Sequence, residues 1–217
     1  MKKVFVIGAH GHVGHYLVPK LVKQGYQVIA GVRKEAEFNS LPKSNLIKPV
    51  LFDLNRSVKA MEATFKSTRP NAIIFSAGAG GGVPAKLTIQ IDLDGAAKSI
   101  LAAEKAGIKR YEMVSAVGSD NRKVWSSSSL YVYYAAKHYA DLYLRSSNLD
   151  YTILHPVALS NDSETGKIQL HPQDLTQVSI SRADVANVLV EVLDNSKTIY
   201  HEYTIANGAT PIKDIFG

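Results

Sequence analysis

Short apolar runs alternate along this chain with longer segments in which apolar residues recur every three or four positions. Short runs are typical of buried strands, whereas the longer spacing is typical of helices that cover one face of a sheet. The runs predict strands at Val4–Ile7, Gln27–Val32, Leu46–Leu51, Ala72–Phe75, Arg110–Val114 and Tyr151–Leu154. Strands and helices in this alternation predict a parallel sheet that is covered on both faces.

The helical spacing begins directly after the first strand. Val13, Leu17 and Leu21 share one face of a helix that Gly25 ends, and Pro19 is expected to bend this helix or to remove one hydrogen bond. The same spacing predicts helices at Val58–Lys66, at about Thr88–Ala106, at Tyr131–Arg145 and at Val185–Leu193. The tetrapeptide Ser181-Arg182-Ala183-Asp184 is a capping box that opens the last of these helices.

This alternation predicts a doubly wound α/β fold with strand order 3-2-1-4-5-6, because crossovers between parallel strands are right-handed. Tyr200–Ile205 predicts a seventh strand. We expect a single domain over residues 1–217, with a core over about 1–155 and a smaller C-terminal part over about 156–217 that faces the substrate. Asn161–Gly166 is polar and turn-rich, so we expect a mobile surface loop there.

Composition narrows the class of protein. The chain has 217 residues, of which 46% are hydrophobic and 20% charged, so it can bury a core. It has no cysteine, which excludes a disulfide scaffold and a thiol nucleophile and suits a reducing cytoplasm, the expected location. The net charge of +6 comes from scattered Lys and Arg, so we expect phosphorylated small molecules as ligands and no nucleic acid. No apolar stretch has the length of a membrane span, so no membrane partner is expected.

The turn between the first strand and the first helix, Gly8-Ala9-His10-Gly11-His12-Val13-Gly14, carries the clearest chemical signal. In such a turn the first glycine permits a tight bend, the second lets the backbone approach a pyrophosphate, and the third allows close helix packing. Unpaired amides at the helix N-terminus then bind phosphate. We therefore expect cofactor contacts from Gly8, His10, Gly11, His12, Val13 and Gly14. A purely structural turn is the alternative.

The end of the second strand bears on which dinucleotide is bound. NAD sites usually place Asp or Glu there, where it holds the ribose hydroxyls, but this chain has Arg33 and Lys34. The planar guanidinium of Arg33 suits a 2′-phosphate. The sequence therefore favours NADP over NAD, with Glu35 and Glu37 close by as the reason against it.

Later strand ends supply the remaining expected cofactor contacts. Asp53 and Leu54 follow the third strand, where an adenine edge would lie, and the alternative role of Asp53 is to cap the next helix. Ala77 and Gly78 follow the fourth strand and open a glycine-rich loop. Pro156 ends the sixth strand.

Together with these residues, three later segments resemble the short-chain dehydrogenase/reductase superfamily: Asp92-Leu93-Asp94-Gly95-Ala96, Val114-Ser115 and Tyr133-Tyr134-Ala135-Ala136-Lys137. More narrowly, nearly the whole chain is similar to the atypical members grouped with NmrA-like and NAD(P)-dependent epimerase/dehydratase-like proteins. The resemblance implies a Rossmann-like fold that binds NADP or NAD.

The resemblance also implies catalytic roles. Tyr133 and Lys137 match a Tyr-x-x-x-Lys motif and share one helix face. In that motif the lysine lowers the pKa of the tyrosine from about 10 and holds the nicotinamide ribose, while the tyrosine passes a proton to the substrate. The alternative is that one of several tyrosines meets Lys137 by chance. Ser115 is the candidate for the catalytic serine, with Ser119 as the later alternative, and Asp92 replaces the usual asparagine.

These features predict an NADP-dependent oxidoreductase that acts on a small carbonyl- or quinone-like molecule. The polar loop Ser126–Ser129 and the segment after Pro156 are expected to wall the substrate. The departures at Asp92 and Ser115 favour the alternative of a non-catalytic, NADP-sensing regulator that binds a protein partner. A flavin- or biliverdin-reductase-like enzyme is a further alternative.

The histidines do not predict a metal site. His10, His12 and His15 surround the glycine turn, and the helical His-Glu-x-x-His pattern is absent from the sequence. His155 precedes Pro156, and we expect its backbone to lie near the nicotinamide.

Overall fold

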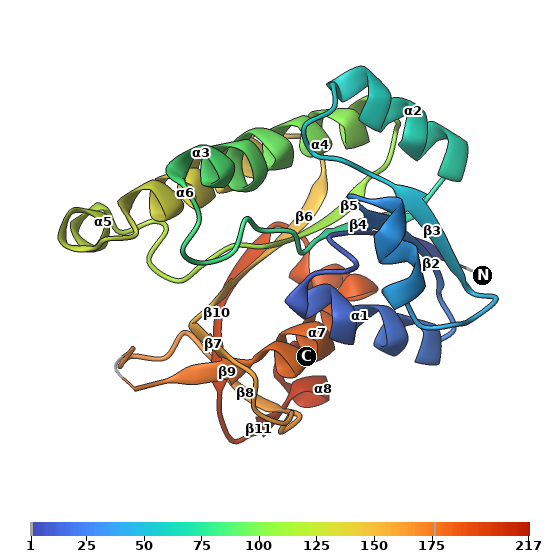
Figure 1. The fold of residues 1–217 in the computed structure, drawn as a ribbon. Helices are drawn as coiled ribbons and strands as arrows, with labels where there is room; N and C mark the ends of the chain where they lie inside the picture. The colour runs from blue at the N-terminus through green and yellow to red at the C-terminus, as the bar shows by residue number, and fades with distance from the viewer. Residues whose placement is uncertain (1, 176) are drawn as a thin grey trace.

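The computed structural model describes residues 2–175 and 177–217. Within them, one sheet runs through the molecule in the order β11-β8-β10-β6-β5-β4-β1-β2-β3 (Figure 1). Its central strands are parallel: β1 (Lys3–Ile7), β2 (Gln27–Val32), β3 (Ile47–Leu51), β4 (Ala72–Phe75), β5 (Arg110–Val114) and β6 (Asp150–Pro156). The predicted order 3-2-1-4-5-6 and the Rossmann-like class are confirmed.

The C-terminal segment extends this sheet. The seventh strand is β10 (His201–Asn207), which pairs in parallel with β6 as predicted. Two short strands, β8 (Lys167–Leu170) and β11 (Thr210–Pro211), add an antiparallel edge. β7 (Ala158–Ser160) and β9 (Ser179–Ser181) form a separate small sheet. The sequence did not reveal these four strands, because runs of two to four residues are too short to show a period.

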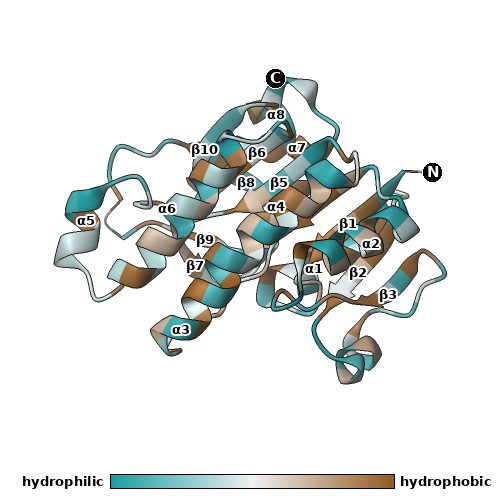
Figure 2. Ribbon diagram, turned by 90° about the horizontal axis from the view of Figure 1, so that it is seen from above, coloured by the Kyte–Doolittle hydropathy of each residue, from teal (hydrophilic) through white to brown (hydrophobic). Residues whose placement is uncertain are grey.

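Helices cover both faces of the sheet (Figure 1). One face carries α1 (His12–Lys23), α7 (Arg182–Leu193) and α8 (Ile212–Ile215), and the other carries α2 (Val58–Thr68), α4 (Ala96–Lys105) and α6 (Tyr131–Arg145). Alternate residues of β1 face opposite sides, so Val4 and Val6 pack in the first core and Phe5 and Ile7 in the second. The helices carry both polar and apolar residues, as Figure 2 shows. Among the described residues, none of the helices is both long and apolar enough to cross a membrane.

The segment predicted as one helix over about Thr88–Ala106 has three parts. A turn of α-helix, α3 (Ala85–Thr88), leads into a π-helical stretch, η2 (Ile89–Gly95), and then into α4. The prediction of one regular helix was therefore wrong. A π-helical stretch is rare and often occurs at functional sites, and Asp92 lies within this one.

The other loops also differ in detail from the prediction. Ser126 and Ser127 belong to a short helix, α5 (Arg122–Ser127), rather than to a loop. The polar segment before β8 lies on the surface, but the Asp184 carboxylate accepts the backbone N–H groups of Thr165 and Gly166, each at 2.9 Å, and so ties it to α7. The cap of α7 is confirmed, since the Ser181 hydroxyl accepts the N–H of Asp184. Two 3₁₀ helices, η1 (Glu35–Ser40) and η3 (Ser196–Thr198), complete the elements.

Candidate cofactor and catalytic site

The glycine turn is shaped by close backbone contacts at the carboxyl end of β1. Gly8 has φ +88°, and a Cβ there would lie 2.8 Å from backbone atoms of Ala77, in the loop after β4. A Cβ on Gly14 would lie 2.2 Å from the carbonyl oxygen of Gly8. The protein's own packing therefore requires both glycines, and Ala77 lies against the turn as expected.

The N-terminus of α1 offers uncapped backbone donors for a phosphate. Gly11 is the N-cap and provides no side chain to cap the helix, and the first turn contains no acidic residue. Uncapped first-turn amides at the positive end of a helix bind anions. His10 and His12 are exposed beside them, whereas the Val13 side chain is buried in the core, so Val13 can offer only its backbone. The turn fits the pyrophosphate of a dinucleotide.

The end of β2 presents two exposed cations, Arg33 and Lys34. The Glu37 carboxylate accepts their backbone N–H groups at 2.9 and 3.3 Å, so Glu37 caps η1 instead of neutralising the guanidinium. The hydroxyl of Ser40 donates to the carbonyl oxygen of Glu37 at 2.6 Å and lies 2.7 Å from His10 Nδ1. This hydroxyl therefore links η1 to the glycine turn, next to the place expected for a 2′-phosphate.

The remaining expected cofactor residues lie at the same edge of the sheet. Asp53 follows β3 and accepts the N–H of Asn55 at 2.9 Å, while Ser57 caps α2, so the alternative role of Asp53 as the helix cap is wrong. Leu54 is buried against Gly95 of η2. Gly78 is exposed in the loop after β4, and Pro156 is buried at the end of β6.

A buried ion pair fixes Lys137. Its ammonium lies 3.0 Å from Asp92 Oδ1 and donates to the carbonyl oxygen of Val114 at 3.2 Å. The second oxygen of Asp92 accepts the N–H of Ala79 at 3.0 Å. Burial lowers the pKa of Lys137, but Asp92, Tyr133 and Asp141 together raise it by more, so the ammonium stays charged. The acid in place of the usual asparagine thus holds the lysine.

Tyr133 lies on the same face of α6 as Lys137, as the spacing predicted. The Lys137 ammonium is 5.8 Å from the centroid of the Tyr133 ring. Burial raises the pKa of Tyr133 by more than the charge of Lys137 lowers it. The expected lowering of the tyrosine pKa is therefore wrong for this structure, where Asp92 offsets the lysine charge. Tyr133 is a neutral hydrogen-bond donor here.

Ser115 and Ser119, the two candidate serines, bind the same carboxylate. The hydroxyl of Ser115 donates to Asp141 Oδ2 at 2.7 Å, and that of Ser119 donates to the same oxygen at 3.2 Å. Asp141 is one turn beyond Lys137 on α6 and is fully buried. Burial raises the pKa of Asp141 to about 6, against the influence of His155. Sequence reasoning missed Asp141, although its spacing of four residues from Lys137 on the predicted helix was a signal.

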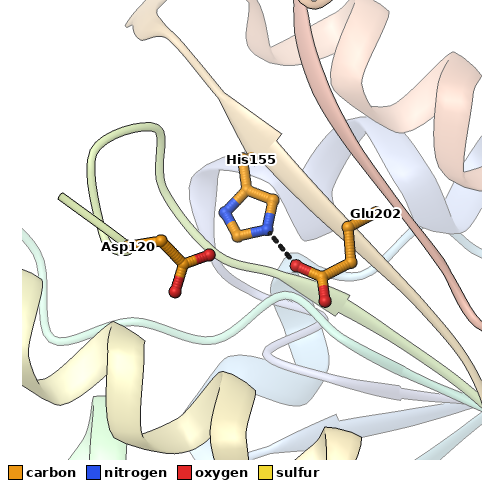
Figure 3. A group of neighbouring side chains, drawn as sticks. All are labelled: Asp120, His155 and Glu202. Atoms are coloured by element: carbon orange, nitrogen blue, oxygen red, sulfur yellow. Dashed lines mark hydrogen bonds and ion pairs between the residues drawn. The ribbon is translucent and has the colours of Figure 1, made fainter.

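Another group that the sequence did not reveal surrounds His155 (Figure 3). Donor atoms of Asp120, His155 and Glu202 lie within 4.8 Å of one another, a spacing that a metal ion could use. The guanidinium of Arg145 already binds both carboxylates, at 2.8 Å from Asp120 and 2.7 Å from Glu202. Both carboxylates of the group are thus already paired with a positively charged side chain. The imidazole of His155, expected to have only a positional role, bonds to Glu202 through Nε2 at 2.9 Å.

The glycine turn, the cations after β2 and the Tyr133–Lys137 pair at one edge of a doubly wound sheet define a dinucleotide-binding protein of the Rossmann type. Residues 8–196 match the family described as NAD(P)H-binding. The chain belongs to this family.

Relatives share nearly the whole chain. It is 42% identical over 213 residues to the uncharacterized sugar epimerase YhfK of Bacillus subtilis (strain 168), covering 98% of this chain and 97% of that protein. Among solved structures, a putative NAD-dependent epimerase/dehydratase from Bacillus halodurans is 38% identical with a TM-score of 0.89, covering 98% and 97% of the two chains. The oxidoreductase ylbE from Lactococcus lactis is 35% identical with a TM-score of 0.87, covering 99% and 94%. These likenesses confirm the resemblance to NAD(P)-dependent epimerase/dehydratase-like proteins.

Proposed function

We propose that this protein is an NADP-dependent oxidoreductase that acts on a small carbonyl- or quinone-like substrate. The proposal rests on one arrangement. The residues of the proposed site belong to different elements but lie at one edge of the sheet, where the carboxyl ends of the parallel strands meet. They are the glycine turn, Arg33 and the group of Tyr133, Lys137 and Ser115. Ligands of doubly wound proteins bind outside this edge.

The binding roles follow from the contacts. In the proposal, the amides at the start of α1 bind the pyrophosphate, and the exposed guanidinium of Arg33 binds the 2′-phosphate. Lys137, fixed by Asp92 and the Val114 carbonyl, orients the nicotinamide ribose. The bound nicotinamide supplies or accepts the hydride.

Two hydroxyl groups serve the substrate oxygen in this proposal. Tyr133 keeps its proton, because burial raises its pKa, and so donates a hydrogen bond to that oxygen. Ser115 lies at the end of β5, directly after the carbonyl group that holds Lys137. A donor aimed at a developing oxyanion contributes about 2.7–4 kcal/mol to catalysis.

Calorimetric titration of the purified protein with NADPH and with NADH tests the cofactor. We expect NADPH to bind more tightly, because only NADPH carries the phosphate that Arg33 can pair with. Tighter binding of NADH would overturn the choice of cofactor. Binding of neither would overturn the role of the glycine turn. NADPH oxidation with menadione, a simple quinone, then tests the reaction.

Sugar epimerisation is the second candidate, favoured by the similarity to the Bacillus subtilis protein named as a sugar epimerase. An epimerase returns the hydride within one catalytic cycle, so it consumes no NADPH. Inversion at one sugar carbon with a constant NADPH concentration would favour this candidate. A regulator that only senses NADP predicts tight binding with neither reaction.

A further inference from the structure

A series of hydrogen bonds runs from the end of β5 to Glu202 on β10. Ser115 Oγ is 2.7 Å from Asp141 Oδ2, which is 3.2 Å from Ser119 Oγ. Ser119 Oγ is 3.3 Å from His155 Nδ1, and His155 Nε2 is 2.9 Å from Glu202 Oε2. Each link joins groups that can pass a proton, and these groups come from the loop after β5, from α6, from β6 and from β10.

This series of hydrogen bonds is buried at the Ser115 end and reaches solvent at the Glu202 end. Ser115, Ser119, Asp141 and His155 are all buried, whereas Glu202 is partly exposed. Asp141 Oδ1 has no hydrogen-bond partner among the described residues, although a buried carboxylate oxygen is costly to leave unpaired. A carboxyl group that takes up a proton avoids most of this cost. The series therefore begins beside Lys137 and the proposed substrate oxygen, and it ends at solvent.

We propose that Ser115, Asp141, Ser119 and His155 form a relay that supplies a proton to the substrate oxygen during the proposed reduction. The inference rests on the proposed function for the identity of the substrate, but the hydrogen bonds of the relay are present in the protein without substrate and can be tested there. Asp141, Ser119 and His155 are positioning and relay residues, and Ser115 is the group that contacts the substrate.

The proton moves along these hydrogen bonds in the order given above. Hydride addition to the substrate carbon leaves its oxygen in need of one proton. Ser115 gives its hydroxyl proton to that oxygen and recovers one from the Asp141 carboxyl. Ser119 donates its hydroxyl proton to Asp141 and takes the proton that His155 Nδ1 releases. His155, which starts as an imidazolium with its Nε2–H donated to Glu202, is neutral after this release, and one proton from solvent restores the imidazolium before the next turnover. In the oxidation direction every step reverses.

The charged groups around the relay determine the pH range in which it can transfer protons. Asp141 is faced by Lys137 and Arg145 from α6 and by His155 from β6, and burial raises its pKa to about 6. The pKa of His155 is lowered by burial, but the hydrogen bond to Glu202 and the charge of Asp141 raise it by more. Asp120 also lies close to His155. The Asp141 carboxyl thus titrates in the range where a relay can load and release a proton, and the imidazole holds its proton more tightly than a free histidine does.

Nuclear magnetic resonance of the protein without ligand tests the relay directly. Carbon-13 in the aspartate carboxyl groups and nitrogen-15 in the histidine rings report Asp141 and His155 during a pH titration. We expect the Asp141 signal to titrate near pH 6 and the His155 signals to shift over the same interval. Asp141→Asn should remove that shift of His155. Ser119→Ala, a milder change, should weaken this coupling and leave only its electrostatic part.

Glu112→Gln is the matched control, because Glu112 is equally buried but lies outside the relay, next to Arg110 on β5. It should leave the His155 titration unchanged. The relay is wrong if Asp141 titrates as an ordinary exposed carboxylate, or if His155 is unaffected by Asp141→Asn. It is also wrong if Ser119→Ala leaves the coupling of the two titrations undiminished, since the coupling would then act only through space and not through the hydroxyl.

Turnover of NADPH with menadione gives the second measurement. Ser115→Ala and Asp141→Asn should each lower kcat about 10²-fold while KM for menadione and the Kd for NADPH stay within about twofold. Misfolding would instead weaken NADPH binding as well. Unchanged kcat in both variants would overturn the relay. If the wild-type protein binds NADPH but does not oxidise it, the proposed function fails, and the titrations still decide whether the relay exists.

Discussion

Asp92 and Lys137 form an ion pair inside the protein, with 3.0 Å between the carboxylate and the ammonium. Both side chains are almost completely buried. The same carboxylate holds the N–H of Ala79, so it joins the π-helical stretch η2 to α6 and to the loop after β4. One buried acid thus positions both the lysine and a loop that borders the proposed cofactor site.

Replacement of Asp92 by Asn should destabilise the protein by about 2–4 kcal/mol, because it leaves the Lys137 ammonium buried without its counter-charge. Urea denaturation, monitored by circular dichroism, measures this loss of stability. Adding Lys137→Met to Asp92→Asn should restore part of it, since the unpaired charge is then gone. If the loss of stability in the double variant equals the sum of the losses in the two single variants, the pair does not act as a unit.

Asp94→Asn is the control for this prediction. Asp94 pairs with Lys98 on the outer side of the same helical segment, and 56% of its side chain is exposed. Exposed pairs contribute little, so the free energy of unfolding should change by less than about 0.5 kcal/mol. Equal losses at Asp92 and Asp94 would contradict the special role of the buried pair.

Gly14→Ala should destabilise the protein by about 3 kcal/mol or more and weaken NADPH binding, because the added methyl group would lie 2.2 Å from the Gly8 carbonyl oxygen. The backbone of the turn would have to move, and with it the amides that bind phosphate. Gly81→Ala, where nothing lies within 4 Å of the added Cβ, should cost less than about 1 kcal/mol. Thermal unfolding and calorimetry measure both effects.

Local patterns were sufficient to predict the core of this fold. Apolar runs located the six central strands and the seventh, and the glycine spacing located the turn at β1. The four-residue spacing of Tyr133 and Lys137 placed both on one face of α6. Each of these signals lies within one turn or one strand, where the periods of helix and strand determine which side chains meet.

Contacts between distant segments could not be predicted in the same way. Asp141 and His155 come from α6 and β6, and Glu202 lies on β10, which pairs with β6 in a register that the sequence does not reveal. The π-helical stretch was missed because one extra residue in a helix shifts the apolar period only slightly. The raised pKa of Tyr133 depends on burial and on Asp92, which follow from the assembled fold rather than from the motif.

Glu112 should make the protein less stable as the pH rises. Burial raises its pKa from 4.5 to about 8, despite the Arg110 guanidinium at 3.1 Å. The folded state therefore keeps a proton that the unfolded state loses, so stability falls between about pH 4.5 and pH 8. Glu112→Gln removes this titration and should reduce the fall by about 2–4 kcal/mol. Urea denaturation at several pH values measures it, and parallel curves for the two proteins would show that Glu112 is already ionised.

Arg33→Ala should weaken NADPH binding about 10- to 100-fold and change NADH binding less than about twofold, because only NADPH carries the 2′-phosphate that a guanidinium grips with two hydrogen bonds. Titration calorimetry with both dinucleotides measures the two affinities. Lys109→Ala is the control, since it removes one exposed positive charge at the opposite edge of the sheet, just before β5. It should affect both dinucleotides only slightly, through the general field of the protein. If Arg33→Ala weakens the binding of NADPH and of NADH equally, Arg33 contacts a part of the molecule that both cofactors share. The preference for NADP would then have no basis.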